Sequence, residues 1–180
     1  MNYGLSIFIE TFRNSFVLFI RETNFTQKGI VKVVVQRVSE ASVKISGEVH
    51  SEISNGFLIL LGIEHADDKT DADYLVGKLV GMRVFPDDDG KMNRSIVDSG
   101  GSFLVVSQFT LHASTKKGNR PSFIQAARPE QAIPLYEYFL QELGKQSQLK
   151  VEAGVFGADM KVALINDGPV TIIMDSKNRE

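Results

Sequence analysis

Apolar positions from residue 31 onward predict a sheet whose inner strands are covered on both faces. The runs "VKVVVQRVS" (31–39) and "GFLILLGIEH" (56–65) are continuously apolar, which is typical of buried strands, and the second predicts a central one. Between them, "ASVKISGEVHSEIS" (41–54) alternates with a period of two around Ser46-Gly47, which predicts a hairpin.

Two segments have the spacing of helices. In "TDADYLVGKLVGMRVF" (70–85), Thr70 and Asp73 resemble a capping box, and one face carries Leu75, Leu79 and Met82. The second helix is expected within "PEQAIPLYEYFLQELGKQ" (129–146). Because proline costs about 3 kcal/mol in a helix interior, we expect this helix to start near Pro134 or to bend there.

The remaining segments predict further strands. "GSFLVVSQFTLHA" (101–113) is an apolar strand that ends in polar residues, and "LKVEAGVF" (149–156) is another, followed by a turn at 157–160. The class is therefore a mixed α/β single domain with few helices, in which sheet layers are covered by a small helical layer.

The stretch "NDGP" (166–169) interrupts the last apolar segment, between strands expected at 162–165 and 170–174. Glycine and proline are poorly tolerated inside a buried strand. The residue types are typical of a tight hairpin turn. A second interpretation is that the chain presents two main-chain carbonyls to a ligand, and the residue types alone leave both open.

Residues 1–30 differ from the rest in composition, and we expect the folded domain to span 31–180. The segment has no 18-residue apolar run and lacks the features of a secretory signal, so we expect no membrane span. A misplaced start with Val31 as the true initiator, a targeting presequence and a dedicated extra element are the three hypotheses for it.

Composition narrows the chemistry. The chain has no cysteine and three histidines, and its acidic residues form no convincing ligand cluster, so we expect no metal and no cofactor. A net charge of −2 argues against a broad nucleic-acid surface and against DNA binding. The loop "TKKGNRPSF" (115–123) is either a solvated loop or a local phosphate contact, through Lys116, Lys117 and Arg120.

Polar residues at a strand end are a second candidate for chemistry. Ser107, Gln108 and Thr110 fall where an apolar strand meets a loop, which fits either a satisfied strand terminus or a catalytic group. A hydroxyl nucleophile needs a base within reach, and the nearest one in sequence is His112, which would share a strand face with Thr110. Because protein bases are scarce, an enzyme of this sequence would rely on its substrate or on water for proton transfer.

Four motifs together are similar to those of the D-aminoacyl-tRNA deacylases: "VVQRVSEASV" (34–43), "VVSQFT" (105–110), "KKGNRPSF" (116–123) and "NDGPVT" (166–171). The likeness runs from about Val31 to Asp175. It implies a three-layer β/β/α fold and a cytoplasmic homodimer that acts on the 3′ end of aminoacyl-tRNA. The implied reaction is hydrolysis of the ester that links a D-amino acid, or glycine, to the tRNA.

The resemblance also implies a role for each motif. The Gly168-Pro169 bond would be cis and would enter the partner's active site, where its carbonyls exclude the side chain of an L-amino acid. Arg37 would orient those carbonyls. The site itself would be lined by Ser107, Gln108, Phe109 and Thr110, in part through main-chain N–H groups. Phe156 and Met160 would form the pocket for the terminal adenine, and the ribose 2′-OH would activate the attack.

Two other functions remain open from the residues. The first is a non-catalytic module that binds the RNA end without turnover. The second is a serine or threonine esterase that acts on small esters without RNA, against which the missing base and the Gly-Pro motif both count.

Overall fold

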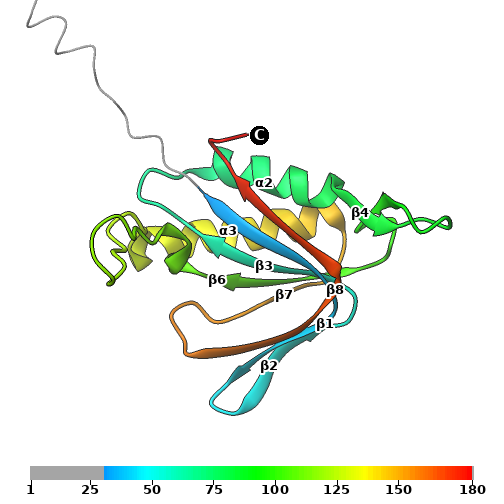
Figure 1. The fold of residues 1–180 in the computed structure, drawn as a ribbon, viewed down its shortest axis with the longest axis horizontal. Coiled ribbons are helices and arrows are strands. Elements are labelled where there is room, and N and C mark those ends of the chain that lie inside the picture. Colours follow the sequence, from blue (N-terminus) through cyan, green and yellow to red (C-terminus); the bar gives the residue numbers. More distant parts are fainter. Residues whose placement is uncertain (1–30, 180) are drawn as a thin grey trace, which may run out of the picture.

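Two long antiparallel strands, β1 (Lys32–Ile45) and β8 (Met160–Asp175), form the axis of the fold in the computed structural model (Figure 1). The structure describes residues 31–179. The two strands pair from Lys32 with Asp175 at one end to Ile45 with Met160 at the other. The hypotheses about residues 1–30 lie outside the described residues.

The main sheet is built around β1. Its order is β2-β1-β3-β6-β7, with β8 paired to β1, and its other strands are β2 (Glu48–Ile53), β3 (Gly56–Gly62), β6 (Ser102–Ser107) and β7 (Val151–Ala153). The predicted hairpin is confirmed: β1 and β2 meet at Ser46 and Gly47, whose φ angles of 52° and 88° suit a tight hairpin turn. β3, β6 and β7 run parallel to one another.

Burial on both faces of β3 explains the three layers. Phe57, Ile59 and Leu61 belong to the cluster that also contains the buried faces of the helices. Leu58, on the opposite face, packs in a second cluster of side chains from β1, β2 and β6, namely Val38, Ala41, Val43, Ile53, Leu104 and Val106. Because successive side chains of a strand point to opposite faces, β3 separates a sheet–sheet core from a sheet–helix core. The β/β/α prediction is confirmed.

The first helix, α2 (Lys69–Gly81), begins one residue earlier than predicted and ends earlier too. The capping box predicted at Thr70 and Asp73 is wrong: Asp68 accepts from the N–H of Asp71, and the carboxylate of Asp71 accepts from the N–H of Asp68. Residues 83–85, which we had included in the helix, belong instead to β4 (Arg83–Pro86), which pairs with β5 (Met92–Ser95). Helical spacing therefore continued past the true end of the helix.

The second helix, α3 (Pro129–Ser147), covers the same side of the sheet as α2 (Figure 1). Its predicted start near Pro134 is wrong. The helix begins at Pro129, where the missing N–H of proline costs nothing. It continues through Pro134, an exposed residue in the second turn. The buried face then packs on the sheet through Leu135, Tyr136, Phe139 and Leu143.

The strand predicted over 101–113 is shorter than expected. β6 ends at Ser107, and residues Phe109–His112 form a short 3₁₀ helix, η1. With three residues per turn, Thr110 and His112 point in different directions. The prediction that they share one strand face is therefore wrong. No helix in the described part of the chain is long and apolar enough to cross a membrane.

Asp67, just before α2, is a buried carboxyl group that titrates near neutrality. It is 8% exposed, its Oδ2 accepts from the N–H of Glu64 at 2.6 Å, and its Oδ1 has no partner among the described residues. Burial raises the pKa of Asp67 to about 7. The folded protein therefore favours the protonated acid.

We predict that Asp67→Asn removes a pH dependence of stability. The stabilisation that comes from the protonated acid is complete below the unfolded pKa of about 4 and is lost as the pH rises through about 7. As the pH rises from about 4 to about 7, the free energy of unfolding of the unmodified protein should therefore decrease relative to that of the variant. Urea unfolding of both proteins across pH 4 to 8 measures it, and a difference that does not change with pH contradicts the assignment.

Candidate functional site

A bulge in β8 carries the Gly-Pro dipeptide. Val38 pairs with Asn166 and Gln36 with Thr171, so the four residues 167–170 stand opposite the single residue Arg37. We call residues 167–170 the Gly-Pro bulge. Because both halves of β8 pair with β1 rather than with each other, the hairpin-turn interpretation is wrong, and the two closing strands are one. The Gly168-Pro169 bond is cis, and both residues are exposed.

The ends of the motif close the neck of this bulge. The side-chain amide of Asn166 donates to the hydroxyl of Thr171 at 3.4 Å. Gly168 has a φ of +125°, a conformation that L side chains rarely adopt. A Cβ at this position would lie 2.8 Å from Nη2 of Arg37. The Asn-x-Gly-Pro-x-Thr motif therefore forms a loop. Its two ends are joined by the hydrogen bond between Asn166 and Thr171, and its backbone conformation requires a glycine at position 168.

Arg37 anchors the bulge from below. It is only 8% exposed, and its Nε lies 3.1 Å from both the carbonyl oxygen and the carboxylate Oδ2 of Asp167. Its Nη1 donates to the carbonyl of Val84 in β4. The sequence had assigned Arg37 to the Gly-Pro carbonyls; in the structure it reaches the carbonyl one residue before Gly168. Asp167 and Val84 were missed, since no pattern in the sequence signals a main-chain acceptor.

A pocket of about 320 Å³ lies at the far end of β3 and β6 from the bulge. Five of the residues predicted for the site line it: Ser107, Gln108, Phe109, Phe156 and Met160. The other walls come from β3, from the start of α3 and from the turn before β8, through residues such as Leu61, Ile63, Ala127, Ala132 and Ala158. The structure thus brings together motifs that are about 50 residues apart in the chain.

The strand end at Ser107 positions the polar side of this pocket. The N–H of Gln108 donates to the carbonyl of Leu61 at 2.7 Å, which ends the β3–β6 pairing and turns the chain into η1. The side-chain amide of Gln108 then donates to the hydroxyl of Thr110 at 2.5 Å. Thr110 does not line the pocket with the other predicted residues. Its hydroxyl is held by Gln108 rather than by a base.

His112 is not placed to activate Thr110. It is 6% exposed, and its Nε2 lies 3.0 Å from where a Cβ would stand on Gly62, beneath the strand end. Burial lowers the pKa of His112, so the neutral ring is favoured. Within residues 31–179, no group of His, Cys, Asp and Glu is clustered closely enough to hold a metal ion. Apart from the exposed carboxylate of Asp159, which is paired with Lys161 at 2.8 Å, the pocket offers main-chain and amide donors.

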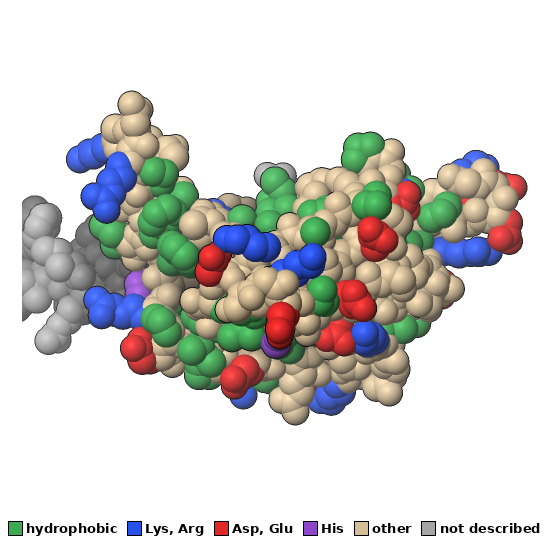
Figure 2. Space-filling model, turned by 90° about the horizontal axis from the view of Figure 1, so that it is seen from below, with side chains coloured by type: hydrophobic (Ala, Val, Ile, Leu, Met, Phe, Trp, Pro, Cys, Tyr) green, Lys and Arg blue, Asp and Glu red, His purple; other side chains and the backbone are tan. Residues whose placement is uncertain are grey.

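Aromatic side chains form the rest of the wall and the rim. Phe156 is half-buried and meets the ring of Tyr136 edge-on at 6.0 Å. Phe109 is 55% exposed at the rim and packs against Phe123 at 5.2 Å. Phe123 belongs to the loop that carries Lys116, Lys117 and Arg120, all exposed beyond the pairing of Ser114 with Ser122. Figure 2 shows this loop as a projection at one end of the molecule, with basic side chains on it.

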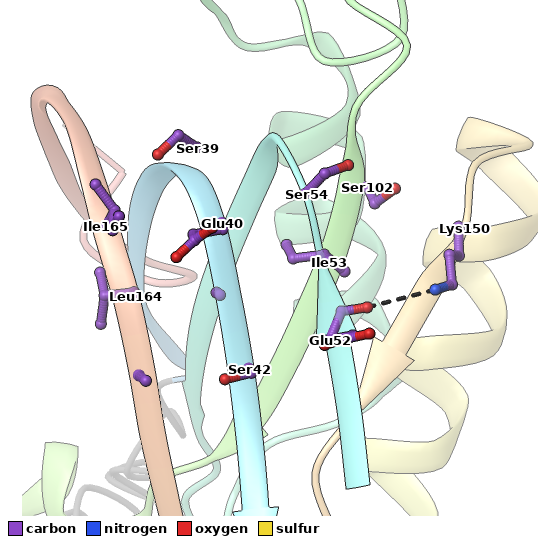
Figure 3. Close-up of a pocket in the computed structure, with 12 residues that line it drawn as sticks. Ser39, Glu40, Ser42, Glu52, Ile53, Ser54, Ser102, Lys150, Leu164 and Ile165 are labelled. Atoms are coloured by element: carbon purple, nitrogen blue, oxygen red, sulfur yellow. Dashed lines mark hydrogen bonds between the residues drawn. The ribbon is translucent and has the colours of Figure 1, made fainter. Parts of the chain in front are cut away.

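A larger hollow, of about 710 Å³, lies elsewhere on the surface (Figure 3). Its walls come from β1, β2 and β8 and carry the exposed carboxylates of Glu40 and Glu52. Lys150 crosses one side and donates to the carbonyl of Glu52 at 3.4 Å. Neither the Ser-Gln-x-Thr motif nor the Gly-Pro bulge contributes to it. We therefore take the smaller pocket as the candidate site.

The bulge cannot reach the pocket of its own chain. Arg37 pairs with Phe57 and Phe57 with Phe103, whereas the pocket's first residue on β6 is Val106, three residues further along that strand. Three residues of strand and three strand spacings correspond to roughly 15–20 Å. Figure 1 likewise shows the middle of β8 and the end of β6 at opposite sides of the sheet. Within one molecule, the bulge and the β6 side of the pocket are therefore well separated.

Comparison with known proteins gives one consistent family. A model of the D-Tyr-tRNA(Tyr) deacylase family matches residues 34–175. Proteins named D-aminoacyl-tRNA deacylase are 57% identical in Flavobacterium johnsoniae and 61% identical in Phocaeicola vulgatus, each over 150 residues. Those residues are 83% of this chain and 100% of each relative.

Two solved structures have the same fold. The "c-Myc DNA Unwinding Element Binding Protein" superposes with a TM-score of 0.75 at 44% identity, over 79% of this chain and 97% of that one. A probable eukaryotic D-amino acid tRNA deacylase superposes with a TM-score of 0.71 at 16% identity, over 81% and 99%. The second likeness concerns the fold alone.

Proposed function

Because this chain belongs to the D-Tyr-tRNA(Tyr) deacylase family, we propose that it is an editing enzyme that hydrolyses D-aminoacyl-tRNA. The products are the free D-amino acid and the tRNA, and glycyl-tRNA is cleaved as well. The observation that carries the details of the proposal is the position of the Gly-Pro bulge, exposed, anchored and out of reach of its own pocket. The activity resides in the domain 31–180, in the cytoplasm, where aminoacyl-tRNA is used.

Selectivity comes from the Gly168 and Pro169 carbonyls of a partner subunit. In the homodimer the bulge of each subunit enters the other's pocket, and its oxygens stand against the α-carbon of the substrate. An L side chain would collide with them, while a D side chain points away. Specificity of this kind needs no pocket for the D side chain, because the wrong substrate is excluded by a clash. Glycine has no side chain to exclude, so it is accepted.

Arg37 supports this role through rigidity. A buried guanidinium bonded to Asp167 and to Val84 ties the base of the bulge to β4. Hydrogen bonds to a charged group typically contribute about 1.5–3 kcal/mol. The carbonyls can exclude an L side chain only if they do not move away from it. An anchored bulge therefore discriminates better between L and D substrates than a flexible loop would.

Exposed apolar residues beside the bulge support the homodimer. Ile165 is 55% exposed and Ile173 is 74% exposed, on either side of the Gly-Pro bulge in β8. A two-fold interface uses the same patch on both subunits, so one pairing inserts two bulges into two pockets. Covering these side chains also removes apolar surface from water.

Catalysis uses the substrate's own hydroxyl. Main-chain N–H groups of Phe109 and Thr110 hold the carbonyl oxygen of the ester, since the N–H of Gln108 is already bonded to Leu61. One such donor can contribute about 10²–10³ in rate. The ribose 2′-OH of the terminal adenosine activates the attack, in keeping with the held Thr110 and the buried His112. Phe156 and Met160 grip the adenine, and base–aromatic contact contributes about 1–3 kcal/mol. Lys116, Lys117 and Arg120 contact the tRNA backbone next to the pocket.

Parallel deacylation time courses of D-aminoacyl-, L-aminoacyl- and glycyl-tRNA test the function, with Gly168→Ala as the variant. The purified protein should hydrolyse the D- and glycyl-esters and leave the L-ester intact. In Gly168→Ala the added Cβ meets Arg37 and the φ of +125° becomes strained, so the bulge shifts. The D/L rate ratio should fall about tenfold or more, corresponding to at least 1.4 kcal/mol of lost discrimination.

Gly77→Ala is the matched control, because a Cβ at this helical glycine has no atom within 4 Å and should leave the ratio unchanged. Binding of charged tRNA without turnover would establish the non-catalytic module instead. An unchanged D/L ratio in a folded Gly168→Ala protein would remove the bulge from the account of selectivity.

We predict that Thr110→Ala retains substantial activity, within about tenfold of the unmodified protein, because a general base or nucleophile would contribute far more. The same D-aminoacyl-tRNA substrate measures kcat for both proteins. A substrate whose terminal adenosine has a 2′-deoxyribose should react much more slowly with either. Near-complete loss in folded Thr110→Ala, with the 2′-deoxy substrate still cleaved, would support a protein nucleophile.

A further inference from the structure

A glycine behind the pocket wall has no side chain where one would meet two residues that line the cavity. Gly154 follows β7 directly, and its N–H donates to the carbonyl of Val105 at 2.9 Å, extending the pairing of β7 with β6. A Cβ built on Gly154 would lie 2.4 Å from Sδ of Met160 and 3.8 Å from Val106. Both neighbours line the pocket. The bare face of Gly154 is therefore turned toward the pocket wall.

The backbone at Gly154 has no room to retreat from such a clash. The hydroxyl of Tyr136 donates to the same Val105 carbonyl at 2.9 Å and lies 3.5 Å from the carbonyl of Gly154. Tyr136 is 4% exposed, and its ring also meets Phe156. The carbonyl of Val105 thus accepts from both the N–H of Gly154 and the hydroxyl of Tyr136, which fixes the backbone just after the end of β7.

Met160, in contrast, can move. Its side chain is unbranched and adapts to the space available. Met160 is half-buried at the start of β8, and its backbone is paired with Ile45. With the backbone fixed on both sides, a methyl group at position 154 displaces the thioether, and the pocket is the open space beside it.

We propose that Gly154 is a specificity-determining residue of the pocket: the absence of its side chain lets Met160 pack against the wall and leaves the cavity wide enough for a purine. Tyr136 acts as a positioning residue that keeps Gly154 in place. This inference rests on the proposed function, since it concerns the pocket assigned to the terminal adenosine. It predicts that the size of residue 154, and not its polarity, controls binding of the tRNA end.

Binding of a non-hydrolysable D-aminoacyl adenosine, with an amide in place of the ester, tests the proposal by calorimetry. Gly154→Ala should weaken binding about tenfold or more, as overpacking of a tight site does. The KM for D-aminoacyl-tRNA should rise in parallel, while kcat at saturation changes little. Gly144→Ala is the control, because its Cβ would make only an ordinary contact with Val151 at 3.7 Å.

A double-mutant cycle with Met160→Ala separates this mechanism from a general loss of structure. Once the thioether is gone, adding Gly154→Ala should change binding by less than about twofold, because the two residues act through one contact. An equal loss in both backgrounds, or no loss in either, overturns the proposal. Unfolding of Gly154→Ala both alone and together with Met160→Ala also overturns it, because the glycine would then be needed for folding of the core rather than for the width of the pocket.

Failure of the proposed function gives a different result. If the unmodified protein bound the adenosine analogue but did not hydrolyse D-aminoacyl-tRNA, the editing activity would be wrong while the cycle still reported on the pocket. If it hydrolysed the substrate and Gly154→Ala left binding and KM unchanged, only the inference about Gly154 would be wrong.

Discussion

A mismatch in length between β1 and β8 produces the Gly-Pro bulge, on which the proposed function depends. Four residues of β8 stand opposite the single residue Arg37, so the chain must leave the sheet there, and it leaves with Gly168 and Pro169 at the surface. Pairing on both sides and the Asn166–Thr171 contact fix the neck of this bulge, and Arg37 fixes its base. In the proposed mechanism, main-chain oxygens held in this way exclude a substrate more effectively than a flexible side chain would.

In the proposed mechanism the pocket receives the bulge of the other subunit, and it lies at the end of β3 and β6 that is far from the bulge in β8. It has amide and main-chain donors, two aromatic residues, a flexible methionine and the exposed carboxylate of Asp159, whereas His112 is buried next to Gly62. A protein with a net charge of −2 gains little from long-range attraction to RNA, so a grip on one nucleotide and a short basic loop suit it. Because the Gly-Pro bulge and the pocket lie far apart in one chain, the proposed mechanism needs two copies of the chain.

Local signals in the sequence predicted local structure well. Ser46-Gly47 specifies a hairpin by itself, and the unbroken apolar run of β3 implies burial on both faces. Predictions failed where a neighbour in space decides the outcome. Helical spacing continued through residues 83–85, yet those residues belong to β4, which pairs with β5. The bulge was not predictable from the sequence, because the register of β8 depends on its pairing with β1. The role proposed for Gly154 was not predictable either, because it depends on the contact with Met160 in the folded chain.

The most direct test of the central claim is a crystal structure of the protein with a non-hydrolysable D-aminoacyl adenosine in the pocket. The distance to measure runs from the α-carbon of the analogue to the carbonyl oxygens of Gly168 and Pro169 in the other subunit. The account predicts contact, within about 4 Å. An α-carbon that meets only solvent or residues of its own subunit, with both bulges elsewhere, would contradict it.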